Sequence, residues 1–266
     1  MSIYNNKCMN RNYSQEVTIL SLHISGENNK SVCFISPEEG ICYATLFGGS
    51  KSKLKSLVCP YNNGKLFLYK DQSKNTCKIT DFDVKKYHPS FRENLFKSYA
   101  ANFVTEIIIK TKCAGSPKEC YTLLNGLLDG MDLSTEYQSR LGLIRFLWRY
   151  LNLLGIQPQT QVCPICGKSH FTRKIEENGL SSKVVYSEGD NGFICESCTD
   201  IHNKKNTITN SSLTYLEAIN NFEPRQVRSI PLSEDSLHEL RELCFYLTES
   251  SCCTKLKSLE IGIGIL

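Results

Sequence analysis

The sequence predicts an α+β protein of several domains, with a small N-terminal β-barrel or sandwich followed by a helical domain that carries a four-cysteine zinc module. Three observations predict this class. Apolar residues alternate with polar ones in short runs before residue 85, they recur every three or four positions afterwards, and two Cys-x-x-Cys pairs interrupt the helical part. The expected domains are residues 1–85 for the barrel, 86–160 for the first helices, 161–204 for the zinc module and 205–266 for the last helices.

Short β-prone runs fill the region from Val17 to Val84 and are separated by turn residues. The runs are EVTILSLHI, SVCFISP, GICYATLFGG, SLVCPYNNG, KLFLYKD and CKITDFDV. Five or six strands at intervals of roughly ten residues are typical of a small antiparallel barrel or sandwich.

Helical periodicity begins after the HPSF segment. The three expected apolar stripes are Phe91, Leu95, Tyr99, Phe103 and Ile107; then Tyr121, Leu124, Leu128 and Met131; then Leu141, Ile144, Leu147 or Trp148, Leu151 and Leu154. The third helix should stop at Gly155, with Pro158 beyond it. Two more helices are expected in SSLTYLEAI and SEDSLHELRELCFYLTES, the second with Ser233 as its N-cap.

Four of the fourteen cysteines form two closely spaced pairs, Cys163 with Cys166 and Cys195 with Cys198. A two-residue spacer lets both sulfurs of a pair face one ion, and four thiolates complete the tetrahedral shell of zinc. The CPICG segment suits such a knuckle, because glycine tolerates a positive φ just after the second sulfur. We therefore expect one structural zinc ion with no open position for catalysis.

The residues around the pairs leave alternatives to this zinc site. His170 and His202 lie near the cysteines and could each replace one as a ligand. A thioredoxin-like redox site is the alternative for either pair alone, but it needs a βαβ setting that the sequence lacks. VVYS and GFICE, joined by the turn residues EGDNG, are expected to form a hairpin between the pairs.

Nine of the ten remaining cysteines are expected to be small buried apolar side chains. This applies to Cys33, Cys42, Cys59, Cys77, Cys113, Cys120, Cys244, Cys252 and Cys253. The chain has neither a run of eighteen apolar residues nor an apolar segment near its first residues that could act as a signal peptide. We therefore expect a cytoplasmic protein without disulfides.

Motifs for catalysis are absent from the sequence, so binding is the expected activity. We find no Gly-rich phosphate loop, no G-x-S-x-G elbow and no H-E-x-x-H segment, and we expect no enzyme. The net charge of +4 is modest, so nucleic-acid binding would need local clusters of basic residues.

One such cluster lies in FGGSKSKLKSLVCPYNNGKLFLYK, where lysines alternate with aromatic residues. The expected DNA-binding residues are Lys51, Lys53, Lys55 and Lys65, with Arg145 and Arg149 as a second basic pair one helical turn apart. Ammonium groups for phosphates and aromatic faces for bases are what a single-strand groove uses, although lysines in a loop are also typical of a solvated surface.

The order of these parts resembles the RecO family of bacterial recombination mediators. The similarity is carried by GGSKSKLKSLVCP, LIRFLWRYLNLLGIQPQTQVCPICG, GFICESC and LKSL, and it extends from about Val17 to Leu259. The resemblance implies an OB-fold barrel followed by a helical domain with a zinc-binding module. It assigns the DNA role to Lys51, Lys53 and Lys55.

The resemblance also implies a role in DNA repair and homologous recombination. Family members bind single-stranded and duplex DNA and anneal complementary strands. With the partner RecR they load the recombinase RecA onto strands coated by single-strand-binding protein, whose C-terminal tail they grip. Such a protein would work in the cytoplasm, at the nucleoid, and not at a membrane.

Two other functions remain open from the residues alone. An RNA-binding OB-fold protein with a zinc ribbon would carry the same barrel and cysteines, but it would prefer RNA and would not anneal DNA. A zinc-dependent or thiol-dependent enzyme would bind its metal through three protein ligands and a water, in contrast to four sulfurs.

Overall fold

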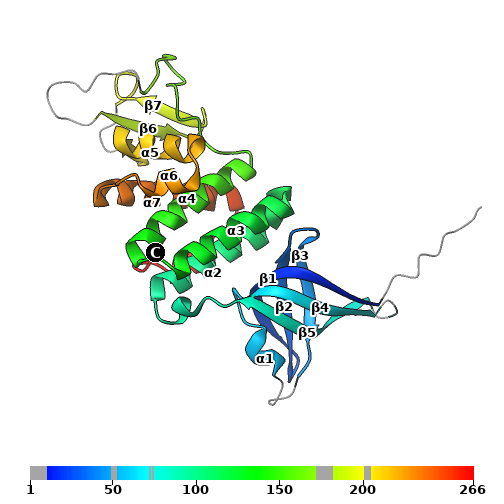
Figure 1. Ribbon diagram of the computed structural model, residues 1–266. Helices are drawn as coiled ribbons and strands as arrows, with labels where there is room; N and C mark the ends of the chain where they lie inside the picture. The colour runs from blue at the N-terminus through cyan, green and yellow to red at the C-terminus, as the bar shows by residue number, and fades with distance from the viewer. Residues whose placement is uncertain (1–10, 49–52, 72, 74, 172–181, 201–204) are drawn as a thin grey trace, which may run out of the picture. The chain divides into compact units, whose positions relative to one another are not determined.

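The computed structural model of the chain describes residues 11–48, 53–71, 73, 75–171, 182–200 and 205–266. It divides into two compact units, Met1–Leu133 and Ser134–Gly264, which are described separately (Figure 1). Within the described residues, none of the helices has the length and apolar character needed to cross a membrane.

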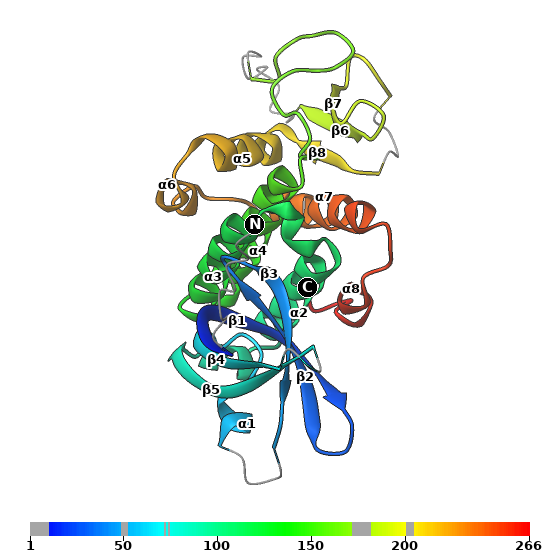
Figure 2. The ribbon, with the colours of Figure 1, turned by 90° about the vertical axis from the view of Figure 1, so that its right-hand side faces the viewer.

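The first unit is built on a closed five-stranded barrel (Figures 1 and 2). Its strands are β1 (Asn12–Ser25), β2 (Asn29–Ser36), β3 (Gly40–Leu46), β4 (Asn63–Asp71) and β5 (Thr76–Lys86). The order around the barrel is β1-β2-β3-β5-β4, and only the β3–β5 pair is parallel among the described strands. A short helix, α1 (Leu54–Leu57), joins β3 to β4. This is an OB-like barrel, as expected from the resemblance.

The barrel interior is filled by alternate residues of each strand, because successive side chains of a strand point to opposite faces. Its core includes Val17, Ile19, Val32, Phe34, Ala44, Leu46, Leu66, Leu68, Ile79 and Phe82, and Val58 beyond α1 joins them. The alternation that predicted the strands is therefore the alternation that fills the core.

One predicted strand, SLVCPYNNG, is wrong. Its first part belongs to α1, and the next residues form a turn that ends where β4 begins. Pro60 cannot donate to a strand ladder, Tyr61 has a φ of 70°, and the Asn62 side chain donates to the Leu57 carbonyl at 2.8 Å. Five strands therefore close the barrel, and the SLVCPYNNG run anchors α1 through buried Val58.

Two helices complete the first unit: α2 (Leu95–Lys110), after a 3-10 turn at Pro89–Arg92, and α3 (Pro117–Asp132). Polar side chains join α3 to the barrel. The Asn63 Nδ2 amide nitrogen lies within hydrogen-bond distance of three acceptors, Thr18 Oγ1 at 2.9 Å, the Tyr121 hydroxyl at 2.7 Å and Asn125 Oδ1 at 3.2 Å, which share its two N–H groups. Asn63 is 8% exposed, so these bonds form in a shielded setting where each unmade bond is costly.

The first predicted helical stripe is partly wrong. Leu95, the first residue of α2, is 69% exposed. Asn94 caps the helix by accepting from the Lys97 backbone N–H at 3.0 Å. The buried face of α2 is shifted by one residue from the predicted stripe at this end, where Phe96 is buried.

The second unit combines helices with a three-stranded sheet. Its elements are α4 (Glu136–Leu153), β6 (Lys183–Ser187), β7 (Gly192–Cys195), β8 (Thr207–Thr209), α5 (Asn210–Asn221), α6 (Pro224–Arg228), α7 (Glu234–Cys252) and α8 (Lys257–Ile261). The sheet order is β7-β6-β8, and the predicted hairpin is its β6–β7 pair. Ser233 caps α7 as predicted. Nearly every apolar side chain of α4 is buried, Trp148 and Tyr150 among them, so α4 is the central helix of this unit.

A carboxylate on α5 accepts hydrogen bonds from the segment that follows α4. Glu217 accepts from the Thr160 hydroxyl, from Gln161 Nε2 at 3.0 Å and from Asn221 Nδ2 at 2.7 Å. These groups line an open polar cavity of about 320 Å³. Burial raises the pKa of Glu217, but the hydrogen bonds outweigh burial and lower it overall. The charged carboxylate therefore stabilises the fold.

We expect Glu217→Ala to lower the free energy of unfolding by about 1–2 kcal/mol at pH 7, since several donors lose their acceptor while solvent reaches part of the site. Because the folded pKa lies below the unfolded value, this contribution is present above the unfolded pKa and is lost as the pH falls through the folded pKa. Urea unfolding at pH 7 and at low pH measures it, with Glu249→Ala as the control. A variant difference that does not shrink at low pH would contradict the role of the charge.

Candidate metal centre and nucleic-acid surface

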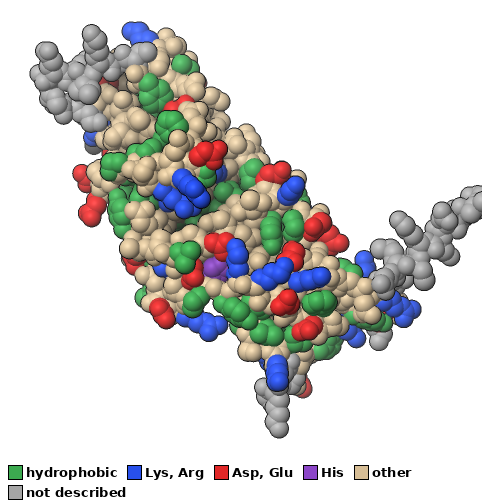
Figure 3. All heavy atoms as spheres, in the orientation of Figure 1, with side chains coloured by type: hydrophobic (Ala, Val, Ile, Leu, Met, Phe, Trp, Pro, Cys, Tyr) green, Lys and Arg blue, Asp and Glu red, His purple; other side chains and the backbone are tan. Residues whose placement is uncertain are grey.

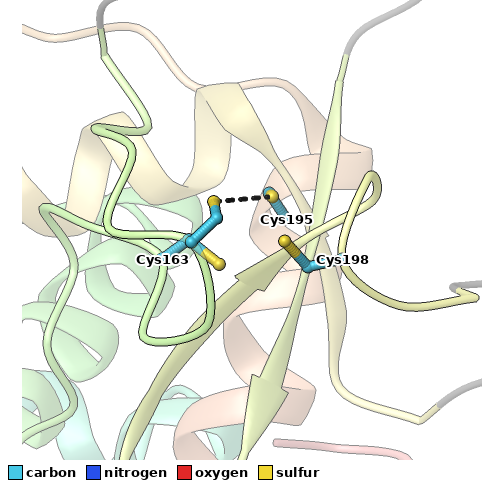
Figure 4. Close-up of side chains that lie close together, drawn as sticks. Cys163, Cys195 and Cys198 are labelled. Carbon is cyan, nitrogen blue, oxygen red and sulfur yellow. Dashed lines mark hydrogen bonds between the residues drawn. The ribbon is translucent and has the colours of Figure 1, made fainter.

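The four paired cysteines converge on one point in the second unit. The sulfur atoms of Cys163, Cys166, Cys195 and Cys198 all lie within 4.8 Å of one another, and the Cys166 and Cys195 sulfurs are 3.8 Å apart. Figure 4 shows the side chains of Cys163, Cys195 and Cys198 turned toward the same space. Two come from the loop after α4 and two from the end of β7 and the turn beyond it.

The local backbone explains why each pair presents both sulfurs. In the first pair, the Gly167 N–H donates to the Cys163 carbonyl at 2.8 Å, and Gly167 has a φ of 68° that favours glycine. In the second pair, the Cys198 N–H donates to the Cys195 carbonyl at 2.9 Å. Each pair thus forms a tight turn around its two-residue spacer.

The thiols of the four-cysteine cluster differ in pKa. Burial raises the pKa of Cys163, but N–H groups from Cys195, Cys166 and Ile165 outweigh burial and lower it to about 6. Hydrogen bonding with Cys166, followed by Cys195, raises the pKa of Cys198 to about 12. A cluster that already stabilises one thiolate is suited to exchange its protons for a cation.

The geometry of the cluster fits a tetrahedral metal site. Four sulfurs bound at about 2.3 Å from a zinc ion lie about 3.8 Å from one another, which agrees with the separation of Cys166 and Cys195. His170 is not among the residues whose ligand atoms converge at this point, and its Nε2 lies 2.9 Å from the Phe193 carbonyl oxygen. His202, the other possible ligand, lies outside the described residues. The four cysteines can therefore hold a metal ion.

The expectation of burial for the other cysteines is correct for four and wrong for five. Cys33, Cys113, Cys120 and Cys244 are buried, whereas Cys253 is exposed and Cys42, Cys59, Cys77 and Cys252 are partly exposed. Their positions explain this exposure. Cys42 and Cys77 lie at the edge of the barrel core, and Cys253 follows the end of α7. None of these nine cysteines, all within the described residues, forms a disulfide.

The predicted lysines of the barrel are only partly placed by the structure. Lys51 lies outside the described residues. Lys53 is exposed just before α1, and Lys55 is partly exposed within it. Lys65, on β4, is exposed, and its ammonium nitrogen lies 5.7 Å from the centre of the Phe67 ring. The Lys65–Phe67 pair therefore places a cation beside an aromatic face at the barrel surface.

A second pair of this kind was missed by the sequence reasoning. The ammonium nitrogen of Lys78, on β5, lies 5.1 Å from the centre of the Phe47 ring, just beyond β3. Phe47 is 46% exposed, and Tyr43 on β3 is 57% exposed. The parallel pairing of Thr45 with Lys78 brings these residues together, and Lys78 lies outside the lysine-rich segment that the sequence singled out. Figure 3 shows that acidic and apolar side chains also lie on the barrel surface between its basic groups.

The arginine pair on α4 lies mostly inside the second unit. Arg145 is 8% exposed, and its Nη1 donates to the Tyr215 hydroxyl at 3.0 Å. Arg149 is partly exposed, and its Nη2 is shielded from solvent. A DNA contact by these two residues stays a prediction.

The helices and the cysteine cluster correspond to a known protein family. The family model described as "Recombination protein O C terminal" matches residues 92–260, which include α2 through α7 and all four paired cysteines. The chain belongs to the RecO family. The resemblance drawn from the helix, glycine, proline and cysteine string is thus confirmed.

Several curated relatives carry the name DNA repair protein RecO. The one from Nostoc punctiforme is 28% identical over 194 residues, covering 70% of this chain and 63% of that protein. The one from Desulforamulus reducens is 22% identical over 250 residues, with 93% of each chain covered. The one from Bacillus subtilis is 22% identical over 232 residues, covering 86% of this chain and 85% of that protein. The RecO match thus spans less than two thirds of the Nostoc relative and nearly all of the Desulforamulus one.

Proposed function

We propose that the chain acts in DNA repair and homologous recombination by binding single-stranded DNA on its barrel and annealing complementary strands. The observation that supports this most is membership of the RecO family together with an OB-like barrel whose surface pairs lysines with exposed aromatic rings. Ammonium groups attract phosphates, and aromatic faces stack on bases of any sequence.

Annealing requires neither a nucleophile nor a general base. Two strands repel each other through their phosphates, so a surface that neutralises this charge while leaving the base edges free lets them pair. Lys51, Lys53, Lys55 and Lys65 are the proposed phosphate contacts, and the Lys78–Phe47 pair adds a further cation and ring. A modest number of such contacts allows the protein to leave once a duplex has formed.

The metal has a structural role in this proposal. Zinc bound by four thiolates has no open coordination position, so it fixes β6 and β7 to the loop after α4 and performs no chemistry. As partners we propose RecR, the C-terminal tail of single-strand-binding protein and, indirectly, RecA, each from the family resemblance. Their sites stay unassigned.

Replacing Lys51, Lys53 and Lys55 together by alanine tests the barrel surface. We expect at least a tenfold loss of affinity for a dT oligonucleotide, and a slope of log K against log salt that flattens by about 2, at roughly 0.7 per phosphate contact. Fluorescence anisotropy over a salt series measures both. The control is Lys205→Ala, Lys255→Ala, Lys257→Ala, which removes the same charge from the second unit. Unchanged affinity and slope in the barrel variant would refute the assignment.

The alternative of an RNA-binding protein makes a different prediction. The same barrel would then prefer an RNA strand over a DNA strand of equal length and sequence, and it would not speed DNA annealing. Competition between the two oligonucleotides for the wild-type chain separates the alternatives.

A further inference from the structure

Three arginines of the second unit lie close together and lack carboxylate partners. Arg145 and Arg149 are one helical turn apart on α4, and Arg228 is the last residue of α6. Among the described residues, none of the three forms an ion pair, whereas Arg140, on the same helix α4, pairs with Glu136 at 2.8 Å. Within the part of the chain that the structure describes, Arg145, Arg149 and Arg228 therefore lack the direct carboxylate contact that Arg140 has.

Arg145 is held in place by a neutral group. Its Nη1 donates to the hydroxyl of Tyr215 at 3.0 Å, and the two residues are 8% and 1% exposed. A hydroxyl satisfies one N–H of the guanidinium but does not balance its charge. A shielded cation of this kind is costly unless an anion lies nearby.

The excess of positive charge over acceptors is clearest at Arg149. Its Nη2 is buried and has no hydrogen-bond acceptor in the described structure. Burial lowers the pKa of Arg149, and Arg145 and Arg228 lower it further, while Tyr215 and Glu223 act in the opposite direction. Arg145, Arg228 and Glu223 are thus all close enough to act electrostatically on Arg149.

The one carboxylate in this group already has another role. Glu223 caps α6 in a capping box with Gln226, and the Glu223 N–H donates to the Gln226 side chain at 3.1 Å. The charged groups that act on Arg149 are thus two guanidinium groups, of Arg145 and Arg228, and one carboxylate, which is engaged at a helix end. The local charge is positive, and one guanidinium nitrogen lacks an acceptor.

We propose that Arg145, Arg149 and Arg228 bind a phosphate group. Guanidinium forks match the oxygen geometry of phosphate, and a site with an excess of positive charge favours an anion of high charge. The exposed residues of α6 include Arg225, Gln226 and Arg228, with Pro224 at its start and Phe222, 51% exposed, just before it. Figure 3 shows a small patch of Lys or Arg near the position of α6 in Figure 1, with acidic and apolar side chains close to it.

The phosphate could belong to a small free molecule, either inorganic phosphate or a nucleotide. It could instead belong to the backbone of a nucleic-acid strand. A strand at this site would extend the proposed single-strand binding into the second unit, and that part of the inference rests on the proposed function. The phosphate site itself rests only on the arginines.

Thermal unfolding of the full zinc-loaded chain tests the site directly, with inorganic phosphate compared against chloride at equal ionic strength. We expect saturating phosphate to raise Tm by about 3 °C more in the wild type than in Arg149→Gln or Arg228→Gln. Phosphate also stabilises proteins generally by exclusion from their surfaces, and all variants share that effect. Arg140→Gln, with the same charge change on the same helix, should keep the full shift. Because Arg228 is exposed, its variant should fold even if Arg149→Gln does not.

An equal phosphate shift in the wild type and in Arg228→Gln would overturn the site. A larger Tm shift with an acidic peptide than with phosphate, lost in the same variants, would overturn the choice of ligand.

A second experiment distinguishes the two sources of the phosphate. If a nucleic-acid strand supplies it, Arg228→Gln should weaken dT oligonucleotide binding roughly threefold and flatten the salt slope by about 0.7. Unchanged DNA binding with a lost phosphate shift would assign the site to free phosphate. A wild type that shows the shift but binds no DNA would refute the proposed function and leave the site standing.

Discussion

A chain in which Cys195 and Cys198 are both replaced by serine is expected to lose its zinc. The two remaining cysteines supply only half of a tetrahedral sulfur shell, and serine hydroxyls are poor replacements for thiolates. Because zinc binding contributes directly to the folding of a small module, Tm should fall by about 5 °C or more. Elemental analysis should find close to one zinc ion per wild-type chain.

The matched control is Cys252→Ser, Cys253→Ser, which makes the same chemical change outside the cluster. It should keep the zinc and the wild-type Tm. Wild-type protein purified without metal and with four free thiols at these positions would contradict the assignment, as would a Cys195→Ser, Cys198→Ser chain that retains its zinc.

Gly64→Ala is expected to destabilise the barrel by about 3 kcal/mol or more. A β-carbon at Gly64 would lie 2.1 Å from the Asp83 carbonyl oxygen and 2.9 Å from the Lys85 nitrogen, both backbone atoms of β5. The β4–β5 register is irregular between Asn63 and Gly64, so the strands approach too closely there for any side chain. Urea unfolding followed by circular dichroism measures the loss.

Gly126→Ala is the control for this substitution. Gly126 is exposed within α3, and a β-carbon there meets no atom within 4 Å. Alanine should therefore stabilise the first unit by about 0.5–1 kcal/mol, since glycine is the weaker helix former. Similar stabilities of the two variants would contradict the close approach at Gly64.

The cysteine cluster and most of the elements could be predicted because their signals are local. A two-residue spacer, a strand alternation and a helix cap such as Ser233 each depend on neighbours within a few residues. The predicted strand around Pro60 was wrong because composition alone does not reveal that Pro60, Tyr61 and Asn62 form a turn.

The remaining features depend on pairs that are distant in sequence. The Lys78–Phe47 contact follows from the parallel β3–β5 pairing, and the Asn63–Tyr121 bond follows from the packing of α3 on the barrel. The arginines of α4 appeared as a surface pair by spacing, yet Arg145 donates to Tyr215, 70 residues further along the chain. Such contacts require the tertiary structure, because no periodicity specifies them.

Strand annealing is the measurement that tests the central claim most directly. Two complementary DNA strands, one of them fluorescently labelled, are mixed with the zinc-loaded wild-type chain, with and without single-strand-binding protein. We predict that the wild type speeds duplex formation, that the Lys51→Ala, Lys53→Ala, Lys55→Ala variant does so at least tenfold less, and that Lys205→Ala, Lys255→Ala, Lys257→Ala retains the wild-type rate. Folded, zinc-loaded wild type that leaves the annealing rate unchanged would contradict the account.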